Sequence, residues 1–192
     1  MNSTILFYIL IAILILNFIL DKILDTLNSK HFDDVIPTEL EDVYGKEAYE
    51  KSQAYKKTNA QFSTITGLFS LVLTLAFFFF DGFKYVDEIA RSYSSNTILI
   101  ALIFFGIILI GSDLINTPFS IYKTFVIEEK FGFNKTTKKT FVFDKIKGLL
   151  MTVVLGGGLL ALIVWFYEFA GSNFWIYAWI VVAIFSVFMN MF

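Results

Sequence analysis

The amino-acid sequence predicts an all-α, polytopic membrane protein with five transmembrane helices. Hydrophobic side chains make up 57% of the 192 residues. They gather in runs close to the roughly 20 residues that cross about 30 Å of hydrocarbon as a helix. Stretches such as "ILFYILIAILIL" lack the alternation that strands of a membrane barrel require. The runs predict one membrane domain over 1–192, with spans at about 1–20, 58–80, 97–117, 148–167 and 169–192.

The first span is expected to stay in the mature protein. A secretory signal peptide has a basic start, a short apolar region and a cleavage site of small residues. Here the first charged residue is Asp21, and the apolar run before it is too long for a signal peptide. The run therefore predicts a retained membrane helix.

A helical extension is predicted before the second span, beginning near Glu39. Thr38 and Glu41 form a capping-box pattern, and Glu47 with Lys51 is a favourable pair four residues apart. An apolar stripe is spaced by four and seven residues at Tyr44, Ala48, Tyr55 and Phe62. Such a helix either runs straight into the second span and projects it into the cytoplasm, or lies on the membrane surface.

The third span carries the one acidic residue that falls within an apolar run, Asp113. Ionisable residues inside a bilayer are costly and are candidates for function. Asp113 lies about one helical turn from the predicted end of the span. Two roles are therefore open for it: it anchors the helix at the membrane surface, or it lines a polar cavity together with Asn116. Pro118 predicts a kink or a restart of the helix, because its ring blocks a backbone hydrogen bond.

The fourth span contains three consecutive glycines, Gly156–Gly158. With Ala161 they give a spacing of small residues that lets two helix backbones approach closely. A flexible point in the helix is the other interpretation. A phosphate-binding role is disfavoured because the glycines lie within a span and not between a strand and a helix.

The basic residues predict the orientation of the chain. The connections after the first and third spans hold thirteen lysines, whereas those after the second and fourth hold only Lys84 and Arg91. The positive-inside rule places the lysine-rich connections in the cytoplasm. We therefore expect the N-terminus outside and the C-terminus at the cytoplasmic face.

The inventory of reactive side chains predicts no catalytic or metal site within the chain. There is no cysteine, and the single histidine, His31, cannot supply the two imidazoles of an HExxH motif. His31 near Asp33 and Asp34 is typical of a solvated loop. A net charge of -2 without a basic domain argues against nucleic acid as a partner.

The connection after the third span reads "IEEKFGFNKTTKKTF" and predicts a fixed elbow. Gly132 can take a turn conformation that bulkier residues avoid. The flanking Phe131 and Phe133 can bury their rings at the membrane interface. An ordinary basic loop with aromatic anchors accounts for Lys138 and Lys139 but not for the order of the residues before them.

The same region resembles the signature of the integral-membrane CAAX prenyl protease family. The resemblance rests on Pro118-Phe119, Tyr122, Thr124-Phe125, Ile127-Glu128, Phe131-Gly132-Phe133-Asn134-Lys135 and Thr137. Similar stretches run in order along the chain: "IPTELEDVYGKEAYEKSQAYKKTNAQF", "FVFDKIKG" and "GSNFWIYAW". The likeness covers nearly the whole chain.

The resemblance implies a zinc endopeptidase whose membrane helices form a chamber beneath a cytoplasmic metalloprotease domain. Such enzymes remove the last three residues of prenylated CAAX proteins, and bacterial relatives are expected to cleave other hydrophobic peptides. The elbow would then dock the protease domain through Glu128, Phe131, Gly132, Phe133, Asn134 and Lys135, while Asp113 and Asn116 would line the chamber. Because the sequence ends at Phe192, before HExxH, we expect only the N-terminal membrane portion, without zinc or proteolysis of its own.

Two other functions stay open. A stand-alone membrane scaffold or regulator would keep the helices without a protease domain. A small transporter is disfavoured by the scarcity of charge within the spans and by the lack of paired broken helices. Lysine makes up fourteen of the fifteen basic residues, which points to an AT-rich genome and a bacterial inner membrane.

Overall fold

The structure is a computed structural model that describes residues 2–30, 32, 36 and 45–191. The predicted capping box at Thr38 and Glu41, the stripe residue Tyr44 and the single His31 lie outside the described residues. The chain divides into two compact units, 1–80 with 118–135 and 81–117 with 136–192. Each unit is described by itself.

Helices make up almost all of the described chain, as the sequence predicts. Its elements are α1 (Ser3–Ser29), α2 (Lys46–Phe79), α3 (Gly82–Tyr93), α4 (Thr97–Tyr122), η2 (Lys123–Glu128), α5 (Lys138–Met151), η3 (Thr152–Gly156), α6 (Gly157–Ala170), η4 (Gly171–Asn173) and α7 (Phe174–Met191).

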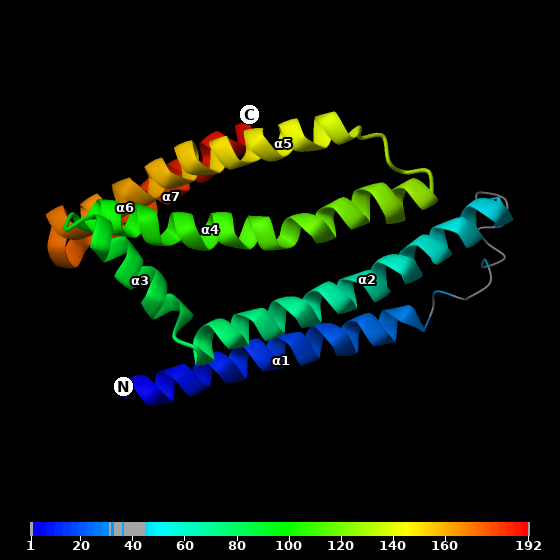
Figure 1. The fold of residues 1–192 in the computed structure, drawn as a ribbon, viewed down its shortest axis with the longest axis horizontal. Helices are drawn as coiled ribbons and strands as arrows, with labels where there is room; N and C mark the ends of the chain where they lie inside the picture. The colour runs from blue at the N-terminus through cyan, green and yellow to red at the C-terminus, as the bar shows by residue number, and fades with distance from the viewer. Residues whose placement is uncertain (1, 31, 33–35, 37–44, 192) are drawn as a thin grey trace. The chain divides into compact units, whose positions relative to one another are not determined.

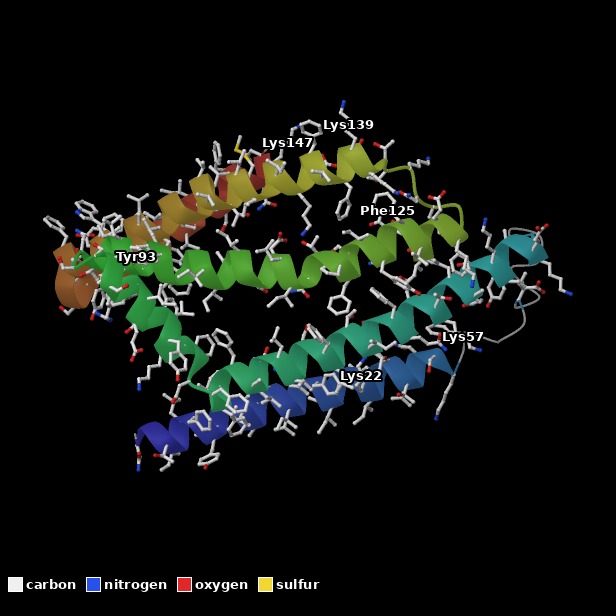
Figure 2. The ribbon with its side chains drawn as sticks, viewed as in Figure 1. Lys22, Lys57, Tyr93, Phe125, Lys139 and Lys147 are labelled. Atoms are coloured by element: carbon white, nitrogen blue, oxygen red, sulfur yellow. The ribbon has the colours of Figure 1, made fainter. Side chains whose placement is uncertain are left out.

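In the first unit, α1 and α2 lie side by side and antiparallel (Figure 1). Near the start of α1, the Phe7 ring meets the Phe79 ring at the end of α2, with centroids 5.6 Å apart. Further along α1, the Lys22 ammonium donates to the Thr64 hydroxyl of α2 at 3.1 Å. Figure 2 shows Lys22 between the two helices. Lys22 also pairs with Asp25 of its own helix at 2.6 Å, so its charge is compensated where α1 passes α2.

The predicted extension before the second span belongs to α2 only from Lys46 onward. The predicted start near Glu39 is wrong for this helix, because Gly45, just before Lys46, has an extended backbone. Lys46–Phe79 is one α-helix, so the charged segment up to Lys57 continues into the apolar run without a break. The stripe residues Tyr55 and Phe62 therefore share a helix with the apolar run. This is the arrangement expected if the extension runs straight into the span.

Pro118 lies inside a helix and does not end it. The α-helix continues to Tyr122 and then widens into a π-helical segment, Lys123–Glu128. Proline has no N–H for the carbonyl one turn earlier, but a helix can accommodate one missing hydrogen bond. The predicted restart of the helix at Pro118 is therefore wrong, because the turns on both sides remain helical.

The second unit ends in an antiparallel pair of helices. After α6, Gly171 takes a φ of 55° and begins the short helical turn η4, Gly171–Asn173. Rings on α6 and α7 then meet across the turn: Phe166 stacks on Tyr177 at 5.4 Å, and Tyr167 contacts Phe174 at 5.1 Å. The chain therefore reverses at Gly171, where a left-handed backbone favours glycine.

The glycines at Gly156–Gly158 lie where a π-helical segment gives way to α6. A Cβ placed on Gly157 would lie 3.7 Å from the Leu102 side chain of α4. That spacing is ordinary van der Waals contact, so Leu102 packs against the bare backbone of Gly157. The helix is continuous through the glycines, and packing is the role that this geometry favours.

Large apolar side chains are mostly exposed on the described helices. Only six hydrophobic residues are buried among the residues that the structure describes: Ile11, Ile36, Val86, Ala90, Ile127 and Phe131. By length and composition, four described segments are able to cross a membrane: Thr4–Ser29, Lys46–Phe79, Thr97–Glu128 and Lys138–Met191. The last of these contains the reversal at Gly171. Apolar surface of this extent requires lipid as its solvent.

Candidate functional site

The predicted elbow is a helix C-cap of the Schellman type. Gly132 has a φ of 72°. Its N–H donates to the Glu129 carbonyl at 3.0 Å, and the N–H of Phe133 donates to the Glu128 carbonyl at 2.8 Å. These two bonds satisfy the last carbonyls of the helix and require a left-handed residue between them. The glycine is therefore needed for its conformation, as the sequence predicts.

The two phenylalanines of the elbow contact α2. Phe131 is buried, with 7% of its surface exposed, whereas Phe133 is 51% exposed. The Tyr55 ring of α2 lies 5.4 Å from the Phe131 ring and 4.7 Å from the Phe133 ring, edge to face in both pairs. The Lys51 ammonium lies over the Phe133 ring at 5.8 Å. These contacts fix the elbow to the helical extension, and no pattern in the sequence predicts them.

The aromatic contact continues along α2 in steps of seven residues. After Tyr55, Phe62 stacks on Tyr122 with ring centroids 5.5 Å apart. Phe69 then contacts Phe119 at 5.0 Å. Residues seven apart lie on one side of a helix, so the stripe that the sequence showed on α2 is the surface that receives the segment 118–135.

We expect Tyr55→Ala to loosen the elbow. Each edge-to-face pair contributes about 0.5 to 1.5 kcal/mol beyond the area that it buries, so losing both should lower the free energy of unfolding by about 1 to 3 kcal/mol, in addition to the loss of buried area. Thermal unfolding in detergent measures this, and Tyr55→Phe is the matched control because it keeps the ring. Equal midpoints for Tyr55→Ala and Tyr55→Phe would show that the ring contacts do not stabilise the elbow.

The polar side chains of the elbow lie close together. The Asn134 amide donates to the Glu129 carboxylate at 2.8 Å. The N–H of Asn134 also donates to the Glu128 carbonyl at 3.2 Å, so the main chain of Glu128 takes part in the turn. Glu128 is half-buried and Lys135 is exposed. The structure thus brings together the predicted residues from Glu128 to Lys135 and adds Glu129.

The other predicted site residues, Asp113 and Asn116, lie on α4, in the part of that helix that belongs to the second unit. The Lys145 ammonium of α5 pairs with the Asp113 carboxylate at 2.5 Å. The Asn116 amide donates to the Ser112 carbonyl one turn earlier at 2.8 Å. Asp113 therefore links α4 to α5, and its partner is Lys145, one of the basic residues that predict the orientation of the chain.

Exchanging the two charges tests this link. Asp113→Lys should destabilise the chain because it places two ammonium groups together, and adding Lys145→Asp should restore much of the loss. With Asp113 nearly half exposed, we expect a coupling energy of about 0.2 to 1 kcal/mol from the double-mutant cycle. Thermal unfolding of the four variants gives this value. Additive effects would mean that the pair contributes nothing to stability.

The side chains of the described residues do not fit a zinc site. Zinc in proteins is held mainly by cysteine and histidine, joined by carboxylates. The sequence holds no cysteine and one histidine. Within the described ranges, no three residues of the types His, Cys, Asp and Glu are grouped so that they could hold a metal ion.

The long apolar helices and the exposed apolar surface define an integral membrane protein of the polytopic all-α class. Residues 25–192 match a family model described as CAAX prenyl protease N-terminal, five membrane helices. The chain belongs to this family.

Individual relatives agree with the family model. The chain is 37% identical over 161 residues to the probable CAAX prenyl protease 1 of Schizosaccharomyces pombe, covering 74% of this chain and 33% of that protein. It is 32% identical over 159 residues to the CAAX prenyl protease 1 homolog of Mus musculus, covering 79% and 34%. The crystal structure of S. mikatae Ste24p superposes with a TM-score of 0.87 at 29% identity, covering 95% of this chain and 44% of that one. The chain thus spans about a third of the length of the curated relatives it matches.

Proposed function

We propose that this chain is the membrane portion of a CAAX prenyl protease-like zinc endopeptidase. Its helices form part of the wall of a membrane chamber that receives hydrophobic or prenylated peptides. Zinc and the catalytic residues come from a metalloprotease domain outside the chain. The observation that carries the proposal is the family match over residues 25–192, together with relatives of whose length the chain spans about a third.

Five spans are the count that fits this function. The segment Lys138–Met191 is far longer than the roughly 20 residues that one span requires. The reversal at Gly171 and the ring contacts between α6 and α7 support a division into two membrane helices. Together with the three earlier segments, this division gives five, the number in the family description.

The elbow is the proposed docking site for the metalloprotease domain. Its Schellman turn and its contacts with Tyr55 give it a fixed shape, which reduces the entropy that docking would cost. Glu128, Asn134 and Lys135 supply a carboxylate, an amide and an ammonium within one turn of chain. Phe133, which is half exposed, adds an apolar surface beside them. In the second unit, Asp113 and Asn116 are the proposed polar residues of the chamber wall.

Two experiments test the proposed function. Sequencing the DNA downstream of the Phe192 codon should reveal an in-frame HExxH, whereas a stop codon would favour the stand-alone scaffold. A chimera that joins residues 1–192 to the remainder of the Saccharomyces cerevisiae CAAX prenyl protease 1 should cleave a farnesylated CAAX peptide. The control is the same chimera with its HExxH glutamate changed to glutamine. A chimera that elutes as a single folded species, binds zinc and cleaves nothing would contradict the proposal.

The proposed orientation has the N-terminus outside and the lysine-rich connections in the cytoplasm. Because the chain has no cysteine, single cysteines report on it directly. Cysteines at Ser29 and Lys138 should be shielded from an impermeant thiol reagent in intact cells, and one at Ser94 should react. Permeabilised cells, in which all three should react, provide the control. Labelling of Lys138→Cys from outside would overturn the orientation.

A further inference from the structure

The short helix α3, Gly82–Tyr93, differs from the other helices of the chain. Its 12 residues extend about 18 Å, too short to cross about 30 Å of hydrocarbon. It follows α2 and precedes α4, which are both long and apolar enough to span a membrane. Figure 1 shows α3 inclined to α4 within their unit, so the two do not form one straight helix.

The residues of α3 separate into two faces. At 100° per residue, Tyr85, Ile89 and Tyr93 follow one another along one side, next to the buried Val86 and Ala90. The first three are exposed, by 61%, 45% and 78% respectively. Tyr93 is labelled at the end of α3 in Figure 2. Half of the apolar face is thus buried in the protein, and the other half is an exposed strip of two tyrosines and an isoleucine.

The opposite face of α3 is charged but neutral overall. The Lys84 ammonium lies 4.0 Å from the Glu88 carboxylate, and the Arg91 guanidinium donates to Asp87 at 2.7 Å. The hydrogen bond to Asp87 raises the pKa of Arg91 further above its usual value, so the guanidinium stays charged. Each charge on this face has a partner on the same helix.

We propose that α3 is an interfacial helix whose strip Tyr85–Ile89–Tyr93 lies in the bilayer at the boundary between headgroups and acyl chains. In the sequence, α3 is joined at both ends to helices that are long and apolar enough to span a membrane, so its own ends lie close to a bilayer surface. Tyrosine suits this boundary because its ring prefers the acyl chains and its hydroxyl prefers the headgroups. The paired charges face the water on the other side, as in other interfacial amphipathic helices.

The absence of net charge on the polar face of α3 indicates which lipids the helix should bind. An interfacial helix rich in unpaired lysine or arginine gains affinity from anionic headgroups. On α3 each cation is matched by an anion one turn away, so this gain should be absent. The partner is therefore a bilayer surface recognised by its apolar boundary and not by its charge. This inference does not depend on the proteolytic function.

Spin labels on single cysteines in the 192-residue chain test the inference. The labels replace Tyr85, Ile89 and Tyr93 on the strip, with Lys84 and Glu88 as controls on the charged face. In phosphatidylcholine nanodiscs, the ratio of collisions with oxygen to collisions with a water-soluble nickel chelate should be several-fold higher on the strip than at the controls. Adding phosphatidylglycerol should leave the ratios unchanged.

Three outcomes would overturn the inference. Equal, water-like ratios at all five positions would place α3 outside the membrane. Immobile labels on the strip that collide with neither reagent would mean that protein covers it. Ratios that rise only when phosphatidylglycerol is present would show attraction by charge. Size-exclusion profiles matching the unlabelled protein ensure that each label reports on folded chains, and agreement between Ile89 and either tyrosine suffices if one variant fails to fold.

Discussion

In the chimera that carries a metalloprotease domain, Glu128→Gln is expected to lower the rate of peptide cleavage about ten- to a hundredfold. The expectation follows from the proposed docking of the elbow, in which the half-buried carboxylate of Glu128 bonds the domain. Losing a charge-assisted hydrogen bond costs about 1.5 to 3 kcal/mol, which corresponds to this loss of rate if the bond forms only in the assembled enzyme. Asn134→Ala should have a similar effect, because it also releases Glu129 from its hydrogen bond.

Lys138→Gln combined with Lys139→Gln is the matched control for these variants. Both lysines lie at the start of α5, just after the elbow, and an ordinary basic loop would depend on them. Cleavage rates of purified chimeras at equal concentration, with zinc content measured in parallel, distinguish the two roles. Wild-type rates in both Glu128→Gln and Asn134→Ala would reduce the elbow to a membrane anchor.

Gly132→Val should destabilise the chain by about 1 to 3 kcal/mol, the usual cost of holding a residue other than glycine in a left-handed conformation. A Cβ at Gly132 would lie 3.6 Å from the Lys51 ammonium, which is ordinary contact, so the cost comes from φ and not from crowding. A β-branched residue is especially unfavourable at a positive φ. The readout is the midpoint of thermal unfolding in detergent.

Gly132→Asn separates backbone strain from the mere addition of a side chain. Asparagine is much more common than valine at positive φ and often replaces glycine in helix C-caps. It should therefore retain most of the stability and, in the chimera, most of the cleavage. If valine and asparagine lower the midpoint equally, the left-handed conformation is not the reason that glycine is needed.

The helices could be predicted from the sequence because each depends on a local pattern. Runs of about 20 apolar residues mark the membrane helices whatever their neighbours. Helix ends were less predictable: α1 continues past Leu20 to Ser29, and α5 begins at Lys138, ten residues before the predicted fourth span. Charged residues at the end of a membrane helix do not end it, since a helix satisfies its own backbone in water as well as in lipid.

The site was predictable in its turn but not in its contacts. Gly132 between two phenylalanines predicts a left-handed turn, because the need for a positive φ concerns a single residue. Phe131 and Phe133 contact Tyr55 and not lipid. This contact depends on how a segment near residue 130 packs against one near residue 55, which no local pattern encodes. The apolar stripe on α2 predicts that this side of the helix packs against another segment. It does not predict which one, because any aromatic segment of the chain could pack there. The pairing of Asp113 with Lys145 was hidden for the same reason.

The unbroken helix α2 makes the elbow sensitive to the membrane itself. Its 34 residues extend about 50 Å, some 20 Å more than the hydrocarbon layer is thick. Helices adjust to bilayer thickness by tilting, and a tilt of about 5° moves the far end of such a lever by about 4 Å. Tyr55 lies on the projecting part of the lever and holds Phe131 and Phe133. Because Tyr55 lies 24 residues, or about 36 Å, from the end of α2 at Phe79, the same tilt would shift the elbow by about 3 Å, roughly the length of a hydrogen bond, and would couple its position to the lipid composition.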